Sequence, residues 1–267
     1  MTLYSSFETE TLYKYLQNIV NILDEPICIL GGWAVYLTVN DAFNKDTGRN
    51  YLGSRDIDLG FNINKNLDKK QLKSTTIGRS ISSLEKHGFN LLGFRYYKEI
   101  HFDTGKELTP EESKKIPIHN IFTMYVDPIV NEIHPSFRET FGFTPVDESL
   151  LSPVFQDKNN RIELKEFNKL LWLLSPEILL ATKIKSVPNR TRDEKLIKDI
   201  CDIYALNWYS GKSFKKLKDE ACKLLNWKGI EKLQVFIESE KDVFQKAQTA
   251  MDIDAETIKN LFEKLIT

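Results

Sequence analysis

The sequence predicts an α/β (α+β) fold in which a short mixed sheet with helices is followed by an α-helical C-terminal domain. An apolar run at residues 27–30 meets two glycines and then a helical pattern, which is typical of a strand, a turn and a helix. Residues 57–63 alternate apolar and polar side chains, as a half-buried strand does. Apolar residues after residue 175 recur at helical spacing. We therefore expect an N-terminal domain, residues 1–150, and a mainly helical domain, residues 151–267.

Length and composition indicate a soluble, cytoplasmic protein. The chain has 267 residues, of which 41% are hydrophobic and 28% charged, close to the averages of globular proteins. No apolar run has the length of a membrane span, and the N-terminal residues lack a signal-peptide pattern. Cys28, Cys201 and Cys222 are odd in number and far apart, which favours buried thiols over disulfides. A net charge of −1 gives no general argument for nucleic-acid binding.

The first part of the chain predicts the strand and helix that frame the two glycines. Residues 7–23 carry apolar side chains at helical spacing and predict an amphipathic helix. The strand at 27–30 then turns at Gly31 and Gly32 into a short helix beginning near Trp33. Residues 40–50 are polar and are expected to form an exposed loop.

Further elements follow from capping and strand signals. A helix is expected over residues 68–87, with Gly88 just after its end. Residues 89–103 are rich in aromatic side chains and predict a long strand or a bent hairpin arm. The sequence TPEE at 109–112 predicts a short capped helix, because threonine precedes a proline and two acidic residues. Residues 118–130 predict a buried strand interrupted by a carboxylate.

The C-terminal part is expected to be helical throughout after a hairpin at residues 154–164. Ser175 followed by proline predicts the start of a helix that runs to residue 187. The next helix has a stripe of apolar residues, Ile197, Ile200, Cys201 and Tyr204. Its other face carries Lys195, Lys198, Asp199 and Asp202, which are expected to point away from the core. Asp254 predicts the N-cap of a last helix.

Asp56 and Asp58 form the main candidate for chemistry. Both project from the same face of the strand at 57–63, where they repel each other unless a cation or a proton lies between them. Mg²⁺ prefers carboxylate oxygens and is often shared with substrate phosphates. Gly31 and Gly32 lie just upstream, and backbone amides at a helix N-terminus favour an anion. The pattern predicts a metal and phosphate site.

Simpler interpretations of the same residues are available. Asp56 and Asp58 could form an exposed acidic strand edge, and the glycines could only turn the chain. Arg55 could bind a phosphate, pair with one of the aspartates, or be a surface arginine. The four histidines form no zinc pattern, and the chain has no P-loop, which argues against an ordinary ATPase or kinase.

The blocks GG-W-A-V and S-R-D-I-D-L resemble the nucleotidyltransferases of the DNA polymerase β superfamily. The resemblance is greatest to the minimal and AbiEii-like branches, which include bacterial toxin components and antibiotic-modifying enzymes. Gly32 stands where that superfamily commonly has serine. The resemblance implies an enzyme that binds ATP or another NTP with Mg²⁺ or Mn²⁺ and transfers the NMP to an acceptor, releasing pyrophosphate.

The resemblance also implies roles for individual residues. Asp56 and Asp58 would hold the metal ions, and a third carboxylate on a neighbouring strand would complete the set and help activate the acceptor hydroxyl. Asp127 fits that position best, with Asp103 as the alternative.

A second block, ILLATKIKSVPNRTRDEKLIKDICDIYAL, is similar to the helical domain of the same family, which completes the nucleotide cleft. Lys183 would contact the phosphates, an arginine in the following loop (Arg190 or Arg192) would assist, and Asp199 would orient the lysine or contact the nucleotide. The alternative to a nucleotide-binding role is that these charged residues form a solvated helix face.

The acceptor and the partners stay open at this stage. The acceptor could be tRNA or a protein, as in toxin-like members with a cognate antitoxin, or a small hydroxylated molecule. No membrane partner is expected. Two groups of basic residues could form a local nucleic-acid footprint: Lys69, Lys70, Lys73 and Arg79, or Lys212, Lys215, Lys216 and Lys218. The alternative from another class is a non-catalytic nucleotide-binding or partner-binding protein with the same fold.

Overall fold

The computed structural model describes residues 3, 6–225, 227–239 and 242–266. Its contacts divide the chain into two compact units, each assembled from separate stretches of sequence. The sheet unit comprises Ser6–Leu30 and Ser54–Leu173. The helical unit comprises Gly31–Gly53 and the described part of residues 174–267. The units interleave along the sequence, and the functional boundary predicted after residue 150 stays a prediction.

The sheet unit is built on a mixed sheet to which nine strands of the described chain contribute. These are β1 (Ile27–Ile29), β2 (Asp56–Phe61), β3 (Asn90–Leu92), β4 (Arg95–His101), β5 (Glu107–Leu108), β6 (Ile121–Val130), β7 (Val146–Asp147), β8 (Arg161–Glu166) and β9 (Lys169–Leu174). The order is β3-β4-β6-β2-β1-β9-β8, with β5 beside β4 and β7 beside β6. β2 is parallel to β6 and antiparallel to β1. The predicted mixed sheet is confirmed, and it is larger than the short sheet expected.

The helices of the sheet unit are mostly short. They are α1 (Ser6–Ile22), α3 (Lys69–Ser74), α4 (Thr76–Lys86), α5 (Pro110–Ser113), α6 (Phe137–Phe141) and α7 (Leu151–Gln156), with 3₁₀ turns at Ile118–Asn120 and Lys158–Asn160. α1 confirms the helix predicted over residues 7–23. The single helix predicted over residues 68–87 is wrong, because Thr75 is extended and caps α4 by accepting a hydrogen bond from the amide of Gly78.

Strand β2 has the alternation that the sequence predicts. Ile57 and Leu59 are buried, whereas Asp56 and Asp58 are half-buried on the opposite face. Gly60 departs from the alternation and is buried. A Cβ at Gly60 would lie 2.8 Å from the Cδ1 of Leu30, so only glycine fits here without a shift of its neighbours. β2 is thus fixed by tight packing directly beyond its two aspartates.

The predicted hairpin at residues 154–164 is wrong in position. The observed hairpin joins β8 to β9 through Phe167 and Asn168, both with left-handed backbone at φ 54° and 60°. β9 also contradicts the expectation that everything after the hairpin is helical. Its run KLLWLL pairs in parallel with β1. The prediction failed because a continuous apolar run lacks the alternation of apolar and polar residues that distinguishes a strand from a buried helix.

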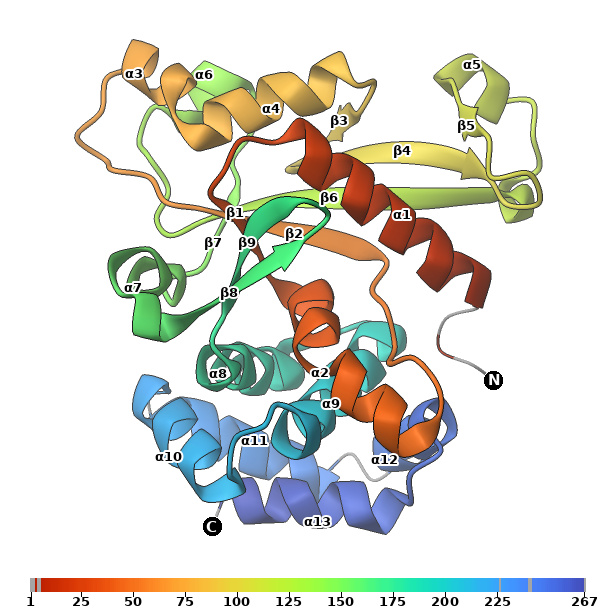
Figure 1. Ribbon diagram of the computed structural model, residues 1–267, viewed down its shortest axis with the longest axis vertical. Coiled ribbons are helices and arrows are strands. Elements are labelled where there is room, and N and C mark those ends of the chain that lie inside the picture. Colours follow the sequence, from red (N-terminus) through yellow and green to blue (C-terminus); the bar gives the residue numbers. More distant parts are fainter. Residues whose placement is uncertain (1–2, 4–5, 226, 240–241, 267) are drawn as a thin grey trace. The chain divides into compact units, whose positions relative to one another are not determined.

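The helical unit consists of α2 (Gly31–Thr47), α8 (Pro176–Ser186), α9 (Asp193–Tyr209), α10 (Phe214–Leu224), α11 (Trp227–Ser239), α12 (Asp242–Met251) and α13 (Ala255–Ile266), with a 3₁₀ turn at Val187–Asn189 (Figure 1). The loop predicted at residues 40–50 is wrong up to Thr47, because Val39 and Phe43 extend the buried stripe of α2 from Val35. The helical C-terminal part of the predicted fold is confirmed.

Two further predictions concern the helical unit. Asp254 caps α13 as expected, since its carboxylate accepts a hydrogen bond from the amide of Thr257 at 2.9 Å. The expectation that Lys198, Asp199 and Asp202 of α9 point away from the core is wrong, because all three are buried.

Among the described residues, no helix combines the length and apolar character needed to cross a membrane.

Candidate functional site

Strands β2 and β6 bring three carboxylates onto one face of the sheet. In this parallel pair Asp58 lies directly opposite Asp127, and Asp56 lies opposite Tyr125. Paired residues in a sheet share a face, and residues two apart on one strand do too. Asp56, Asp58 and Asp127, which we call the acidic cluster, therefore project together. The side chains of Asp56 and Asp127 are only 13% and 9% exposed, so their mutual repulsion is weakly screened by water.

Arg95 lies against the acidic cluster. It begins β4, which is antiparallel to β6, and Figure 1 shows these two long strands side by side. Its Nε donates a hydrogen bond to Oδ1 of Asp127 at 2.9 Å, and its Nη2 donates to Oδ2 of the same carboxylate. The same Nη2 lies 3.6 Å from Oδ2 of Asp56. The guanidinium thus binds one carboxylate bidentately and reaches a second.

Two aromatic rings flank the guanidinium. The Cζ of Arg95 lies 4.3 Å from the ring centroid of Tyr125 and 5.3 Å from that of Phe94. Arginine stacks favourably on aromatic faces, so these rings help to fix the side chain. Its side chain remains 16% exposed, which leaves the guanidinium a way to solvent.

The charges of the acidic cluster set the protonation of Arg95. Burial alone would lower the pKa of Arg95, but hydrogen bonding to Asp127 and the charges of Asp127, Asp56 and Asp58 outweigh it, so the pKa is raised. The guanidinium is therefore a permanent cation, and it neutralises part of the charge of the three carboxylates.

The other candidates in the sheet unit lie elsewhere. Arg55 donates to Oε1 of Glu8 on α1 at 2.8 Å, and its side chain is 39% exposed. Asp103 is exposed in the turn beyond His101, at the end of β4 opposite to Arg95. Since β4 is antiparallel to β6, the geometry brings Asp127 to Asp58 and leaves Asp103 at the far end of the strand.

Gly31 and Gly32 open α2 in the helical unit, as the strand, turn and helix pattern predicted. Gly31 has φ 58°, a conformation that favours glycine. The residue before it, Leu30, belongs to the sheet unit and donates its amide to the carbonyl of Asp58 at 3.0 Å. The last residue of this stretch of the sheet unit is therefore hydrogen-bonded to β2, the strand that carries Asp56 and Asp58. The predicted phosphate contacts of Gly31, Gly32 and Arg55 stay predictions.

Lys183 lies in a buried charged network of the helical unit. Its Nζ is 2.6 Å from Oδ1 of Asp199 and 2.7 Å from Oδ2 of Asp202. The lysine is 6% exposed and the two aspartates 2% and 0%. Burial alone would lower the pKa of Lys183, but the two carboxylates raise it above its usual value. In this structure the lysine holds α8 to α9, and nucleotide binding by Lys183 and Asp199 stays a prediction.

Further groups complete this network. Asp199 also accepts from Nε of Arg190 at 2.6 Å and from the hydroxyl of Ser186 at 2.9 Å. Asp202 accepts from the hydroxyl of Tyr51 at 2.8 Å and pairs with Lys198. Burial alone would raise the pKa of Asp199, but Lys183 and Arg190 lower it below its usual range. The network therefore favours the ionised form of the Asp199 carboxylate in the core.

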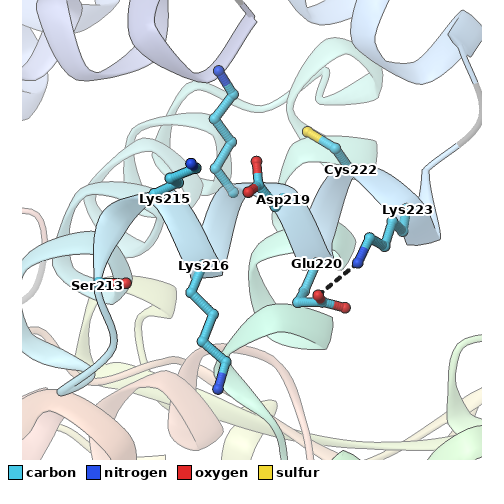
Figure 2. A pocket seen from close by; sticks show the side chains of 8 residues that line it. Ser213, Lys215, Lys216, Asp219, Glu220, Cys222 and Lys223 are labelled. Carbon is cyan, nitrogen blue, oxygen red and sulfur yellow. Dashed lines mark hydrogen bonds and ion pairs between the residues drawn. The ribbon is translucent and has the colours of Figure 1, made fainter.

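Helix α10 carries an open, shallow depression lined by charged side chains. Figure 2 shows Lys215, Lys216 and Lys223 extending from the helix, with Lys223 paired to Glu220 at 2.7 Å. Asp219 also lines this surface. The lining includes four lysines and two acidic residues, so it keeps a net positive charge, and contact with a phosphate backbone stays a prediction. In the other basic group, Arg79 pairs with Asp24 and Lys69 with Glu139, which offsets the charge of two of its four members.

The acidic cluster suits a metal chemically but holds an organic cation. Three carboxylates on one face are the donors that Mg²⁺ and Mn²⁺ prefer. No group of three or more His, Cys, Asp or Glu among the residues that the structure describes is arranged to hold a metal ion. Arg95 bridges Asp127 and Asp56 instead. A divalent ion at these carboxylates would meet the positive charge of the guanidinium.

Comparison with known proteins gives only a distant likeness. No protein-family model and no curated protein matches the sequence. One solved structure, an antigenic nucleotidyltransferase-like protein from Paracoccidioides brasiliensis, is 16% identical over 93% of this chain and 94% of that one, with a TM-score of 0.38. A likeness at this level assigns no function to the chain.

Two residues of these clusters, Arg95 and Asp202, have only weak signals in the sequence. Arg95 is the first residue of an aromatic-rich strand, and only the pairing of β4 with β6 places it on Asp127. Asp202 lies four residues after Lys198 and three after Asp199, a spacing that puts all three near one helix face. Burial of that face depends on Lys183 of α8.

Proposed function

We propose that this chain is a metal-dependent nucleotidyltransferase, which moves an NMP from an NTP to an acceptor and releases pyrophosphate. The observation that carries the proposal is the register of β2 and β6, which brings Asp58 opposite Asp127 on the face that also bears Asp56. A proposed donor set of three carboxylates from two strands supports Mg²⁺ or Mn²⁺ binding. When bound, the ions would neutralise charge on the attacking and leaving oxygens.

Four residues of the chain would have distinct roles in this reaction. Asp56 and Asp58 would hold the ions through their carboxylate oxygens. Asp127 would also accept the proton of the acceptor hydroxyl, as a general base. Arg95 orients the carboxylate of Asp127 through two hydrogen bonds. Phosphoryl transfer depends mainly on positioning and charge neutralisation, which this arrangement supports.

A labelling experiment tests the proposal. The protein is incubated with each α-³²P-labelled NTP and Mg²⁺ or Mn²⁺, in the presence of tRNA, protein or small hydroxylated molecules. We expect label in one acceptor class with wild type and its loss, by at least a hundredfold, in Asp58→Asn and Asp127→Asn. Asp103→Asn is the matched control, since this exposed carboxylate lies away from the acidic cluster. Equal labelling by wild type and Asp58→Asn would refute the assignment.

One observation favours the second candidate, a non-catalytic nucleotide-binding or partner-binding protein. Arg95 already supplies a cation to the acidic cluster, so the fold is electrostatically satisfied in part without a metal. Nucleotide binding that is measurable by calorimetry, with no label transferred in any acceptor pool, would support this candidate.

A further inference from the structure

The acidic cluster poses an electrostatic problem that Arg95 partly solves. Three carboxylates on one face repel one another when they are ionised, and burial makes this repulsion costly. Arg95 supplies one positive charge, with two hydrogen bonds to Asp127 and a 3.6 Å approach to Asp56. A cation at this place therefore reduces the repulsion among the carboxylates of the acidic cluster.

The position of the guanidinium conflicts with a metal at the same carboxylates. Both oxygens of Asp127 accept a hydrogen bond from Arg95, so the guanidinium holds a positive charge directly against the carboxylate that a metal would use. Two cations on the same carboxylate also repel each other. A divalent ion and the guanidinium are therefore alternative partners of Asp127.

We propose that Arg95 is a resident cation of the acidic cluster, which a divalent metal ion must displace before it can bind Asp127. This inference rests on the proposed function, because it takes the acidic cluster as the metal site. The displacement is local. Arg95 is held at Asp127 by two hydrogen bonds, while its contact with Asp56 exceeds hydrogen-bond length and its side chain is 16% exposed. Tyr125 and Phe94 offer it a stacking surface.

The proposal predicts how metal affinity depends on Arg95. Removing a competing cation leaves the carboxylates free to coordinate, so Mn²⁺ should bind more tightly to Arg95→Gln than to wild type. Lysine keeps the charge but loses the two-pronged geometry, so Arg95→Lys should bind with intermediate affinity. In the absence of metal, Arg95→Gln should unfold at a lower temperature and gain more from added Mn²⁺, because the ion then supplies the missing cation.

The test is a titration of each protein with MnCl₂, in which free Mn²⁺ is measured by electron paramagnetic resonance, and thermal unfolding is recorded with and without the ion. We expect at least a tenfold lower Kd for Arg95→Gln and a smaller decrease for Arg95→Lys. Arg79→Gln is the matched control, because Arg79 also pairs with an aspartate, Asp24 at 2.7 Å, but on the surface of the same unit. Its Kd should equal that of wild type.

The outcomes separate this inference from the proposed function. Equal or weaker Mn²⁺ binding by both Arg95 variants, with wild type binding the ion, would overturn the resident cation and leave the metal site intact. No Mn²⁺ binding by any of the proteins would overturn both. If Arg95→Gln is unfolded without metal, its recovery by Mn²⁺ supports the proposal, and Arg95→Lys supplies the affinity comparison.

Discussion

Replacement of Lys183 by methionine tests the buried charged network directly. The side chain keeps its approximate length but loses the ammonium, which lies 2.6 Å from Asp199 and 2.7 Å from Asp202. Breaking a buried ion pair from one side costs about 3–5 kcal/mol, because a charge is left uncompensated. Asp199 keeps Arg190 and Ser186 as partners. We therefore expect a loss near the lower end, about 3 kcal/mol.

The measurement is equilibrium unfolding in urea, followed by far-ultraviolet circular dichroism. Lys246→Met is the control, because Lys246 pairs with Asp193 in the same unit, but the two side chains are 50% and 73% exposed. An exposed pair of this kind contributes about 0–1 kcal/mol. The double variant Lys183→Met/Asp202→Asn should lose less unfolding free energy than the sum of the losses of the two single variants. Each substitution removes the charge that the other one would leave unpaired. A loss below about 1 kcal/mol for Lys183→Met would refute this account of the network.

Three further changes have expected outcomes that follow from single contacts. Asp254→Ala should destabilise α13 by about 1 kcal/mol in urea unfolding, because it removes the cap on the amide of Thr257; no measurable change would contradict the cap. Gly60→Ala should cost about 1–3 kcal/mol, because the new Cβ would lie 2.8 Å from Leu30, and a stabilised variant would contradict that packing. The pKa of Asp199 is lowered on folding, so its ionisation stabilises the protein above the unfolded pKa, about pH 4, and this stability is lost as pH falls through the folded pKa. Asp199→Asn should therefore lose less stability than wild type as the pH is lowered from 7, measured by urea midpoints. The same loss of stability at low pH in both proteins would contradict the shift.

Local patterns predicted the elements that carry the acidic cluster. The alternation at Asp56, Ile57, Asp58 and Leu59 places the carboxylates on one face and the apolar side chains on the other, and the structure has this arrangement. The turn at Gly31 and the helix after it were also predicted, since a left-handed residue between a strand and a helix favours glycine. Such features depend on residues that are close together in the sequence, so a local sequence pattern can predict them.

Long-range pairing could not be predicted in the same way. The register that sets Asp58 opposite Asp127 joins strands far apart in the chain, and no spacing within either strand specifies it. The position of Arg95 depends on a second such pairing, between β4 and β6. Likewise, Asp202 is buried because Lys183 of another helix compensates its charge, whereas the periodicity of α9 alone indicates a solvated face.

The central claim is that the acidic cluster binds a divalent ion that serves the nucleotide. The most direct test is a crystal structure with MnCl₂ and a non-hydrolysable NTP analogue, with Mn²⁺ located by its anomalous scattering. We predict an anomalous peak within coordination distance of Asp56 and Asp58, with the guanidinium of Arg95 withdrawn from Asp127. A bound nucleotide with no Mn²⁺ at these carboxylates, and with Arg95 still paired to Asp127, would contradict the claim.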